Sequence, residues 1–281
     1  MIEVACLTIY GTVVAVLGPS LLRRLAADGY TPRLSIAAWL IAAGSVFAAW
    51  AMAAVHAMVH GSAGIRAAAA AVAAFRIGWA AANVARRTRA RRTQHHDGLM
   101  LVGQHDDDLG AMIVAADQPL VYCLPSGSGI IVVTTGAQTA LAPEELQAAL
   151  AHERAHLAGR HHLVMTIGYA LAHTLPFLPL LRQLGRQVAT LLEMSADDHA
   201  GRLHGRQTVA QAIAAMAAHT VPAGAMGAGG LSPNSRVRRL RSAGPRWRSR
   251  LATVAVVAAI ALLAAGPYLA TVDPWCSRYH L

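Results

Sequence analysis

Long uncharged apolar runs alternate with polar stretches along this chain and predict several membrane-spanning helices. Val4–Leu22 and Leu34–Val55 are each long enough to cross a hydrocarbon core of about 30 Å as a helix. Leu251–Val272 is a third run of this kind. Ala67–Ala85 is a weaker candidate, because Arg76 lies in its middle and an arginine at that depth costs roughly 2.5–3.5 kcal/mol. The pattern therefore predicts about four transmembrane helices.

The stretch before the last apolar run is more polar and predicts a soluble domain with both strands and helices. Leu120–Leu124 and Ile130–Thr135 are rich in β-forming residues, and the turn-forming sequence between them predicts a β-hairpin. The polar stretch His95–Asp108 predicts a loop. A helix is predicted over Pro143–Ala158, because proline suits its first position and Gly159 suits its end.

The arginines predict an orientation for the spans. The formal net charge is +10, yet residues 97–235 hold 11 acidic residues against 6 arginines, so the basic excess lies beside the apolar runs. Basic segments at Arg23–Arg33, Arg86–Arg92 and Arg236–Arg250 flank these runs. Because arginine-rich segments stay in the cytoplasm, residues 86–250 are predicted to be cytoplasmic and both termini outside. This distribution favours a lipid bilayer as partner and argues against direct binding of nucleic acid.

Composition excludes several other kinds of site. All 24 basic residues are arginine, so a lysine-dependent acylation site is excluded. The three cysteines, Cys6, Cys123 and Cys276, are far apart and form no CxxC motif. Their spacing predicts neither a disulfide framework nor a cysteine zinc site.

The strongest chemical signal is the sequence HERAH, which contains His152, Glu153 and His156. Positions four apart share one face of a helix, so both imidazoles can reach one metal ion. Glu153 lies beside them, placed to take a proton from a water molecule on the metal, whose pKa zinc lowers to about 7. Chance gives roughly 0.01 HExxH matches in a chain of this composition. We therefore predict a Zn²⁺ site with Glu153 as the catalytic base.

A third protein ligand is needed, and two residues compete for the role. The sequence HERAHLAGRHH also satisfies HExxHxxGxxH, in which Gly159 turns the chain and His162 is the ligand. That pattern requires a methionine turn downstream, whereas Met194 lies in a helix-like acidic run. Glu193 belongs to the same run, and we favour it over His162.

Asp197 lies one helical turn after Glu193 and is a candidate to orient a ligating histidine through a hydrogen bond. The role of an ordinary surface acid fits its spacing equally well. Spacing alone gives no catalytic role to the other nearby histidines, which are His161, His162, His199 and His204.

The order of these motifs resembles that of the BlaR/MecR-type antirepressor metallopeptidases. The matching sequences are IIVVTTG, EELQAALAHERAHLAGRHHL, the Leu-Pro-Phe-x-Pro segment and EMSADD, which together cover roughly residues 110–205. The resemblance implies a cytosolic gluzincin domain between membrane spans, with the ligands His152, His156 and Glu193 and the base Glu153. That family usually has an acid where this chain has His161, and a cysteine where it has Ala196.

The resemblance also implies a protein substrate, a cytosolic transcriptional repressor of the BlaI type. Two other functions are compatible with the sequence. One is an HtpX-like membrane protease that digests many unfolded proteins, and the other is a non-catalytic metal-binding membrane scaffold. The sequence contains no signal for an oligomeric state.

Together these patterns predict a mainly α membrane protein with a cytosolic α+β zincin-like metalloprotease domain inserted before the last span. The predicted limits are residues 1–92 for the N-terminal membrane domain, 93–250 for the peptidase domain, 251–272 for the last span and 273–281 for a short external tail.

The uncharged segment Leu163–Leu181 needs a separate prediction. One membrane crossing there would place Glu193 on the opposite side from His152, and two crossings need about 40 residues. Only 36 residues separate His156 from Glu193. We therefore predict a helix that lies against the membrane or the domain core without crossing.

Overall fold

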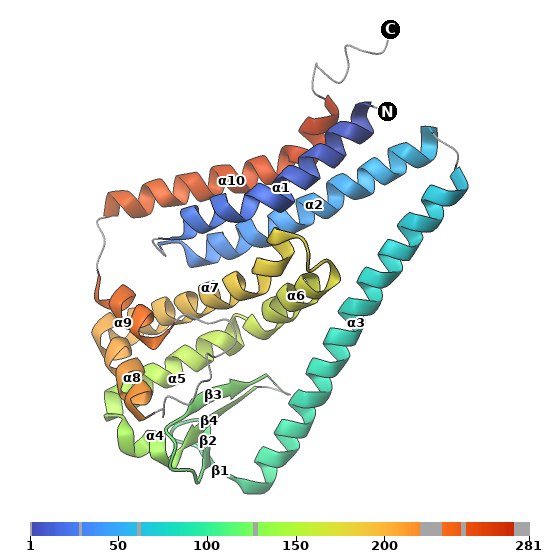
Figure 1. The fold of residues 1–281 in the computed structure, drawn as a ribbon. Helices are drawn as coiled ribbons and strands as arrows, with labels where there is room; N and C mark the ends of the chain where they lie inside the picture. Colours follow the sequence, from blue (N-terminus) through green and yellow to red (C-terminus); the bar gives the residue numbers. More distant parts are fainter. Residues whose placement is uncertain are drawn as a thin grey trace. The chain divides into compact units, whose positions relative to one another are not determined.

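The computed structural model describes residues 2–27, 30–60, 63–125, 129–219, 232–242 and 246–272. Within these ranges the chain is mainly helical and contains one small sheet (Figure 1). In chain order, the elements are α1 (Ile2–Ala26), α2 (Pro32–His60), α3 (Ala63–Val102), β1 (Gly103–Asp106), β2 (Ala111–Val114), β3 (Val121–Leu124), β4 (Ile130–Thr134), α4 (Thr135–Ala140), α5 (Pro143–Ala158), α6 (His161–Thr174), α7 (Pro179–His204), α8 (Arg206–His219), α9 (Pro233–Arg241) and α10 (Arg246–Val272).

The chain divides into two compact units. The helical unit comprises Met1–Asn83, Ile167–Val188 and Pro245–Leu281, and the α/β unit comprises Val84–Thr166 and Ala189–Gly244. The domain limits expected from the sequence, 1–92 and 93–250, stay a prediction. The compact units differ from them mainly because the helical unit includes the segment from α6 to α7.

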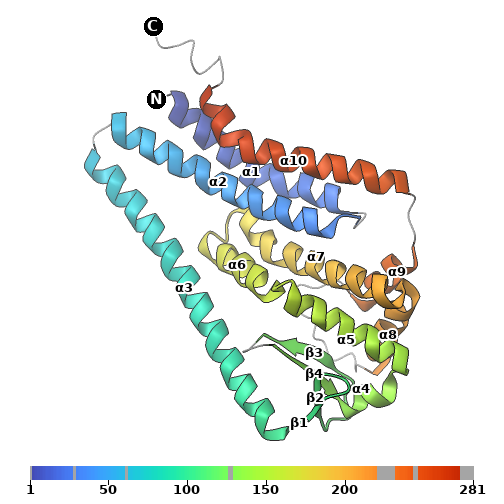
Figure 2. The same cartoon turned by 180° about the vertical axis from the view of Figure 1, so that it is seen from behind.

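Three helices of the described chain, α1, α2 and α10, are long and apolar enough to cross a membrane. They contain three of the predicted apolar runs, and they lie side by side in both views (Figures 1 and 2). Their length and composition suggest membrane insertion. The fourth predicted span, Ala67–Ala85, is helical as part of α3, but it is not among these three and stays a prediction.

A hydrogen-bonded tyrosine joins the three helices of this bundle. The hydroxyl group of Tyr10 on α1 donates to the carbonyl oxygen of Leu263 on α10, at 3.2 Å, and lies 2.7 Å from Ser45 Oγ on α2. Gly266 leaves the space that the tyrosine ring occupies. Small residues and such polar contacts are the usual means by which apolar helices associate in lipid.

Cys6 on α1 is disulfide-bonded. The spacing of the cysteines gave no sign of this bond, so the expectation drawn from spacing is corrected here. Cys123 is a free thiol. The predicted external tail, residues 273–281, also lies outside the described residues.

The uncharged segment Leu163–Leu181 forms parts of two helices and not one. Helix α6 ends at Thr174, and α7 begins at Pro179 after a turn in which the Leu178 N–H donates to Leu175 O. The prolines explain the break, because proline cannot continue a helix but suits the first turn of the next. Neither helix is among the three candidate spans of the described chain. That this segment does not cross the membrane stays a prediction.

The α/β unit contains a four-stranded sheet with the order β1-β2-β4-β3. The pairs β1–β2 and β3–β4 are antiparallel, and β2–β4 is parallel. The predicted hairpin is confirmed as β3 and β4, in which Tyr122 lies opposite Val132. Because β4 is internal, β3 forms an outer edge of the sheet, and α5 packs beside it (Figure 1).

The loop predicted over His95–Asp108 is wrong, because α3 continues to Val102 and β1 follows at once. Leu99 explains the continuation. Its side chain is 5% exposed and packs against buried Met112 and Val132 of the sheet. Burying one such side chain stabilises a fold by about 1.5–3 kcal/mol, enough to extend a helix through polar residues.

Helix α5 has the predicted limits and well-defined ends. Pro143 is its first residue, and the Glu145 carboxylate accepts from the Ala142 N–H at 3.1 Å, which satisfies a donor at the helix start. Leu150 is fully buried on the side that faces the sheet and α8. This packing holds α5, and with it the residues of the HERAH motif, in a fixed position.

Candidate metal centre

Helix α5 brings the two histidines of the HERAH motif together. His152 and His156 are four residues apart, and their Nε2 atoms lie 3.1 Å from each other. The His152 residue is only 8% exposed. Two ring nitrogens at this distance must either share one proton or bind one cation.

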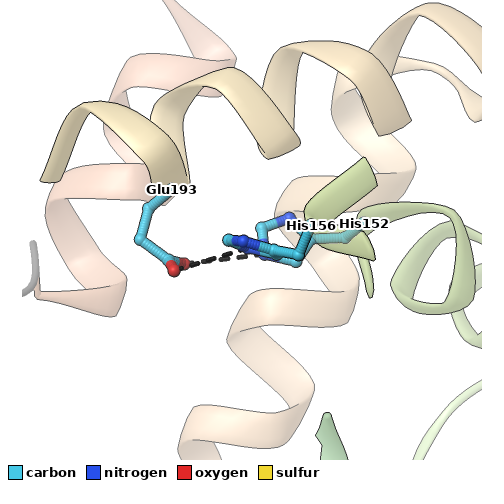
Figure 3. Close-up of side chains that lie close together, drawn as sticks. All are labelled: His152, His156 and Glu193. Atoms are coloured by element: carbon cyan, nitrogen blue, oxygen red, sulfur yellow. Dashed lines mark hydrogen bonds and ion pairs between the residues drawn. The ribbon is translucent and has the colours of Figure 1, made fainter. Parts of the chain in front are cut away.

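Helix α7 supplies the third donor of this cluster. The Glu193 carboxylate points at both rings, with Oε2 3.5 Å from His152 Nε2 and Oε1 3.5 Å from His156 Nε2 (Figure 3). Tetrahedral ligand atoms that lie 2.0–2.2 Å from zinc are separated by about 3.3–3.6 Å. The nitrogen–nitrogen distance of 3.1 Å and the two nitrogen–oxygen distances of 3.5 Å, each to a different Glu193 oxygen, are close to this range. With one atom taken from each residue, the three candidate ligand atoms lie within 4.8 Å of one another, so the group could hold one metal ion.

Glu193, the third ligand favoured from the sequence, is the acidic residue that the fold places beside both histidines. Among the described residues, the group of histidine, cysteine and acidic side chains that could hold a metal ion is His152, His156 and Glu193. His162, the competing ligand, lies on α6 and is not part of this group. The roles of these residues as metal ligands stay a prediction.

Asp197 lies behind His152 on the side away from the cluster. Its Oδ1 atom is 3.1 Å from His152 Nδ1, and its side chain is 1% exposed. This distance is that of an ion pair, and a proton kept on Nδ1 beside this carboxylate would leave Nε2 free to accept a metal. The spacing of one helical turn from Glu193 is what places both carboxylates on the His152 side of α7.

Arg236 on α9 is a further member of the cluster, and sequence spacing gave no signal for it. Its Nε donates to Asp197 Oδ2 at 3.0 Å and its Nη2 donates to Asp197 Oδ1 at 2.6 Å, as a two-pronged ion pair. Its Nη1 lies 3.2 Å from Glu193 Oε2. One guanidinium group thus supports the acid behind His152 and also contacts the third candidate ligand.

Other ionic and polar contacts hold α9 against the rest of the α/β unit. Arg239 Nη2 donates to Asp198 Oδ2 at 2.7 Å. Arg206 on α8 donates from Nε to the Leu240 carbonyl oxygen at 3.0 Å, and from Nη2 to that of Arg239 at 2.9 Å. Cations are favourable at a helix C-terminus because its last carbonyl groups lack helical partners. These contacts fix the position of Arg236.

The charges of the cluster shift the pKa values of its members. Burial lowers the pKa of His152, but hydrogen bonds to Asp197 and Glu193 outweigh it and raise that pKa to about 9. Burial raises the pKa of Glu193, but His152 and Arg236 reduce it to about 2. The pKa of Asp197 also falls to about 2, because His152 and Arg236 offset its burial. Burial and the nearby His152 lower the pKa of His156 to about 4.

Glu153 lies beside the ligands in a different environment. Burial raises the pKa of its carboxyl group, and interactions with His152 and with Cys123 of β3 oppose this rise. Burial and the neighbouring Glu153 raise the pKa of the Cys123 thiol in turn. A buried carboxylate with a raised pKa is suited to accept a proton and return it. Edge strand β3 and helix α5 therefore come together at Glu153.

His161, for which spacing gave no role, contacts the cluster from behind His156. Its Nδ1 lies 2.9 Å from His156 Nδ1, and the two rings meet edge to face with centroids 4.7 Å apart. The resemblance had marked this position as a departure, because an acid is usual there. His161 therefore lies beside the Nδ1 atom of His156, just as Asp197 lies beside the Nδ1 atom of His152.

A comparison with protein families gives a match. The model of peptidase family M48 matches residues 85–257, a stretch that contains every residue of the cluster. Searches of curated proteins and of solved structures found no match. The match covers more than half of the chain and agrees with the two histidines and the glutamate that the fold brings together, and on this basis the chain belongs to peptidase family M48.

Proposed function

We propose that this protein is a membrane-anchored zinc metalloendopeptidase that cleaves a cytosolic protein. The observation that supports this proposal most is the convergence of His152 Nε2, His156 Nε2 and the Glu193 carboxylate at separations of 3.1–3.5 Å. Family membership supports a metallopeptidase independently of this geometry. A zinc ion held there would supply a Lewis acid that polarises the peptide carbonyl and makes water nucleophilic.

In this proposal Glu153 moves the proton. Its carboxylate accepts a proton from the attacking water while the water oxygen bonds to the carbonyl carbon of the peptide. Glu153 then returns the proton to the amide nitrogen as the carbon–nitrogen bond breaks, which yields a carboxylate and an amine. Its raised pKa supports the second half of this cycle, because the acid form must persist long enough to donate.

Edge strand β3 is the proposed binding place for the substrate backbone. Hydrogen-bonded pairs alternate along an antiparallel ladder, and the Thr134 N–H donates to Leu120 O at 3.0 Å. Val121, the next residue, therefore turns its own N–H and C=O toward the open edge. A substrate peptide can add there as another strand beside Glu153.

The α/β unit is proposed to lie in the cytoplasm. Arginines lie in the last turn of α1, within α9 and at the start of α10, and one side of the membrane can hold all of them only if α3 contributes a crossing over Ala67–Ala85. Arg23, at the basic end of α1, donates to Gln183 near the start of α7 at 2.6 Å, which supports the same side for that helix. The disulfide bond of Cys6 supports an external N-terminus, because disulfides persist in oxidising compartments.

The proposed substrate is a transcriptional repressor of the BlaI type, on the basis of the motif order. The family match defines the peptidase and not its substrate. An HtpX-like protease would digest unfolded membrane proteins in general. Incubation of the purified chain with a purified BlaI-type repressor, and with a casein control, separates the two. Cleavage of the repressor at one site supports the regulatory role, whereas equal digestion of both supports quality control.

The variant Glu153→Gln tests the enzymatic proposal. It should reduce peptide cleavage by at least about a hundredfold, because general base catalysis contributes roughly 10²–10⁴ in rate. Zinc content should stay at the wild-type level, because Glu153 is not among the three ligands. The control is Glu144→Gln, the same change at an exposed position of α5, which should cleave normally. If Glu153→Gln retains the cellular function of the protein, a non-catalytic metal-binding scaffold is the better description.

A further inference from the structure

Beyond the three ligands, the structure points to a residue that positions one of them. We propose that His161 fixes the ring orientation and tautomer of His156 through the contact between their Nδ1 atoms, and that the metal affinity of the site depends on this contact. The inference rests on the proposed metal centre. It concerns the side of His156 that faces away from Glu193.

The geometry of the contact determines which nitrogen bears a proton. The His161 and His156 Nδ1 atoms are 2.9 Å apart, the length of a hydrogen bond. For His156 to offer the lone pair of its Nε2 toward Glu193, the proton of that ring must reside on Nδ1. His156 Nδ1–H then donates, and His161 Nδ1 accepts. His161 must consequently be neutral, with its own proton on Nε2.

The turn between α5 and α6 is shaped around this ring. Gly159 ends α5, and a Cβ atom there would lie 2.5 Å from His161 Nε2 and 2.6 Å from its Cδ2. Arg160 follows in the left-handed region, with a φ of 48°. Among the described residues other than glycine, Arg160 is the one with a positive φ. Left-handed backbone is unfavourable for a residue with a side chain, so the local conformation must be stabilised by its surroundings. The result of this turn is that His161 folds back onto His156.

The two candidate histidine ligands are therefore supported by different chemistry. His152 has a carboxylate behind it, and the charge of Asp197 is balanced by Arg236. His156 has a neutral imidazole behind it. Partners of this kind hold the ring of a metal-binding histidine in place, and their removal typically weakens metal binding 10–100-fold. His161 is accordingly a positioning residue and not a ligand.

The test is the zinc affinity of the full chain in detergent, measured by competition with a chromogenic chelator. His161→Ala removes the acceptor and should weaken zinc binding by at least about tenfold. His161→Asn places an amide oxygen where Nδ1 was and should stay within about threefold of wild type. His161→Gln extends its amide toward Gly159 and should bind as weakly as the alanine variant. His162→Ala, the same truncation one residue later, should leave the affinity unchanged.

The asparagine rescue distinguishes positioning from a packing role, because asparagine and glutamine both fill space but only asparagine restores the acceptor. Equal affinity of His161→Ala and wild type would overturn the inference, and so would an asparagine variant as weak as alanine. A wild-type chain that binds no zinc would overturn the metal centre itself, together with this inference. Zinc bound equally by the wild-type, alanine and glutamine proteins would overturn the inference alone.

Discussion

Replacing Arg236 by methionine should destabilise the metal-free protein strongly. Arg236 makes two hydrogen bonds to Asp197, at 2.6 and 3.0 Å, and the Asp197 side chain is 1% exposed. Without the guanidinium, protonated His152 alone would face the carboxylates of Asp197 and Glu193. Removing one partner of a buried ion pair costs about 3–5 kcal/mol. The remaining imidazolium and the 17% exposure of Arg236 place the expected loss at the lower end, about 3 kcal/mol.

Thermal unfolding in detergent with a chelator present measures this loss. A change of 1 kcal/mol moves the midpoint of a domain of this size by about 2–4 °C, so Arg236→Met should unfold about 6–12 °C below wild type. Arg238→Met is the matched control, because Arg238 is exposed on the same helix and should unfold like wild type. The double variant Arg236→Met/Asp197→Asn should recover much of the loss. A midpoint for Arg236→Met within about 2 °C of wild type would refute the reasoning.

Three further outcomes follow from the site. Glu193→Gln should abolish stoichiometric zinc binding while His162→Ala retains it, and the reverse pattern in metal analysis would make His162 the third ligand. Zinc affinity should fall about tenfold for each pH unit below pH 9, because the pKa of His152 is raised to about 9 and protons then compete with the metal for its ring nitrogen. Zinc binding that does not change between pH 6 and 8 would contradict this prediction. Val121→Pro should slow peptide cleavage without loss of zinc, whereas Val121→Ala should not, and equal rates for the two variants would exclude binding at this edge.

The parts of the fold that the sequence predicted are those that depend on local signals. The hairpin and the limits of α5 followed from β-forming residues, a proline and a glycine at fixed places. The predicted loop at His95–Asp108 was wrong, because burial of Leu99 against the sheet outweighs local polarity. Tertiary packing of this kind cannot be seen from periodicity in one segment.

The candidate site likewise contains residues that local sequence signals predicted and one that they did not. The HERAH spacing on one helix predicted the contact of His152 with His156, because helical geometry alone produces it. Glu193 was favoured over His162 on its surrounding sequence, and the fold places it beside both rings. Arg236 could not be predicted, because it lies 39 residues after Asp197 and only the packing of α9 on α7 unites them.

The central claim is that one zinc ion is bound by two imidazoles and a carboxylate. X-ray absorption at the zinc edge, on the full chain purified without chelators, tests it most directly. One zinc per chain is expected, with nitrogen and oxygen neighbours at about 2.0–2.2 Å, and His156→Ala should lose this stoichiometric zinc. A metal-free protein, or a sulfur neighbour near 2.3 Å, would contradict it.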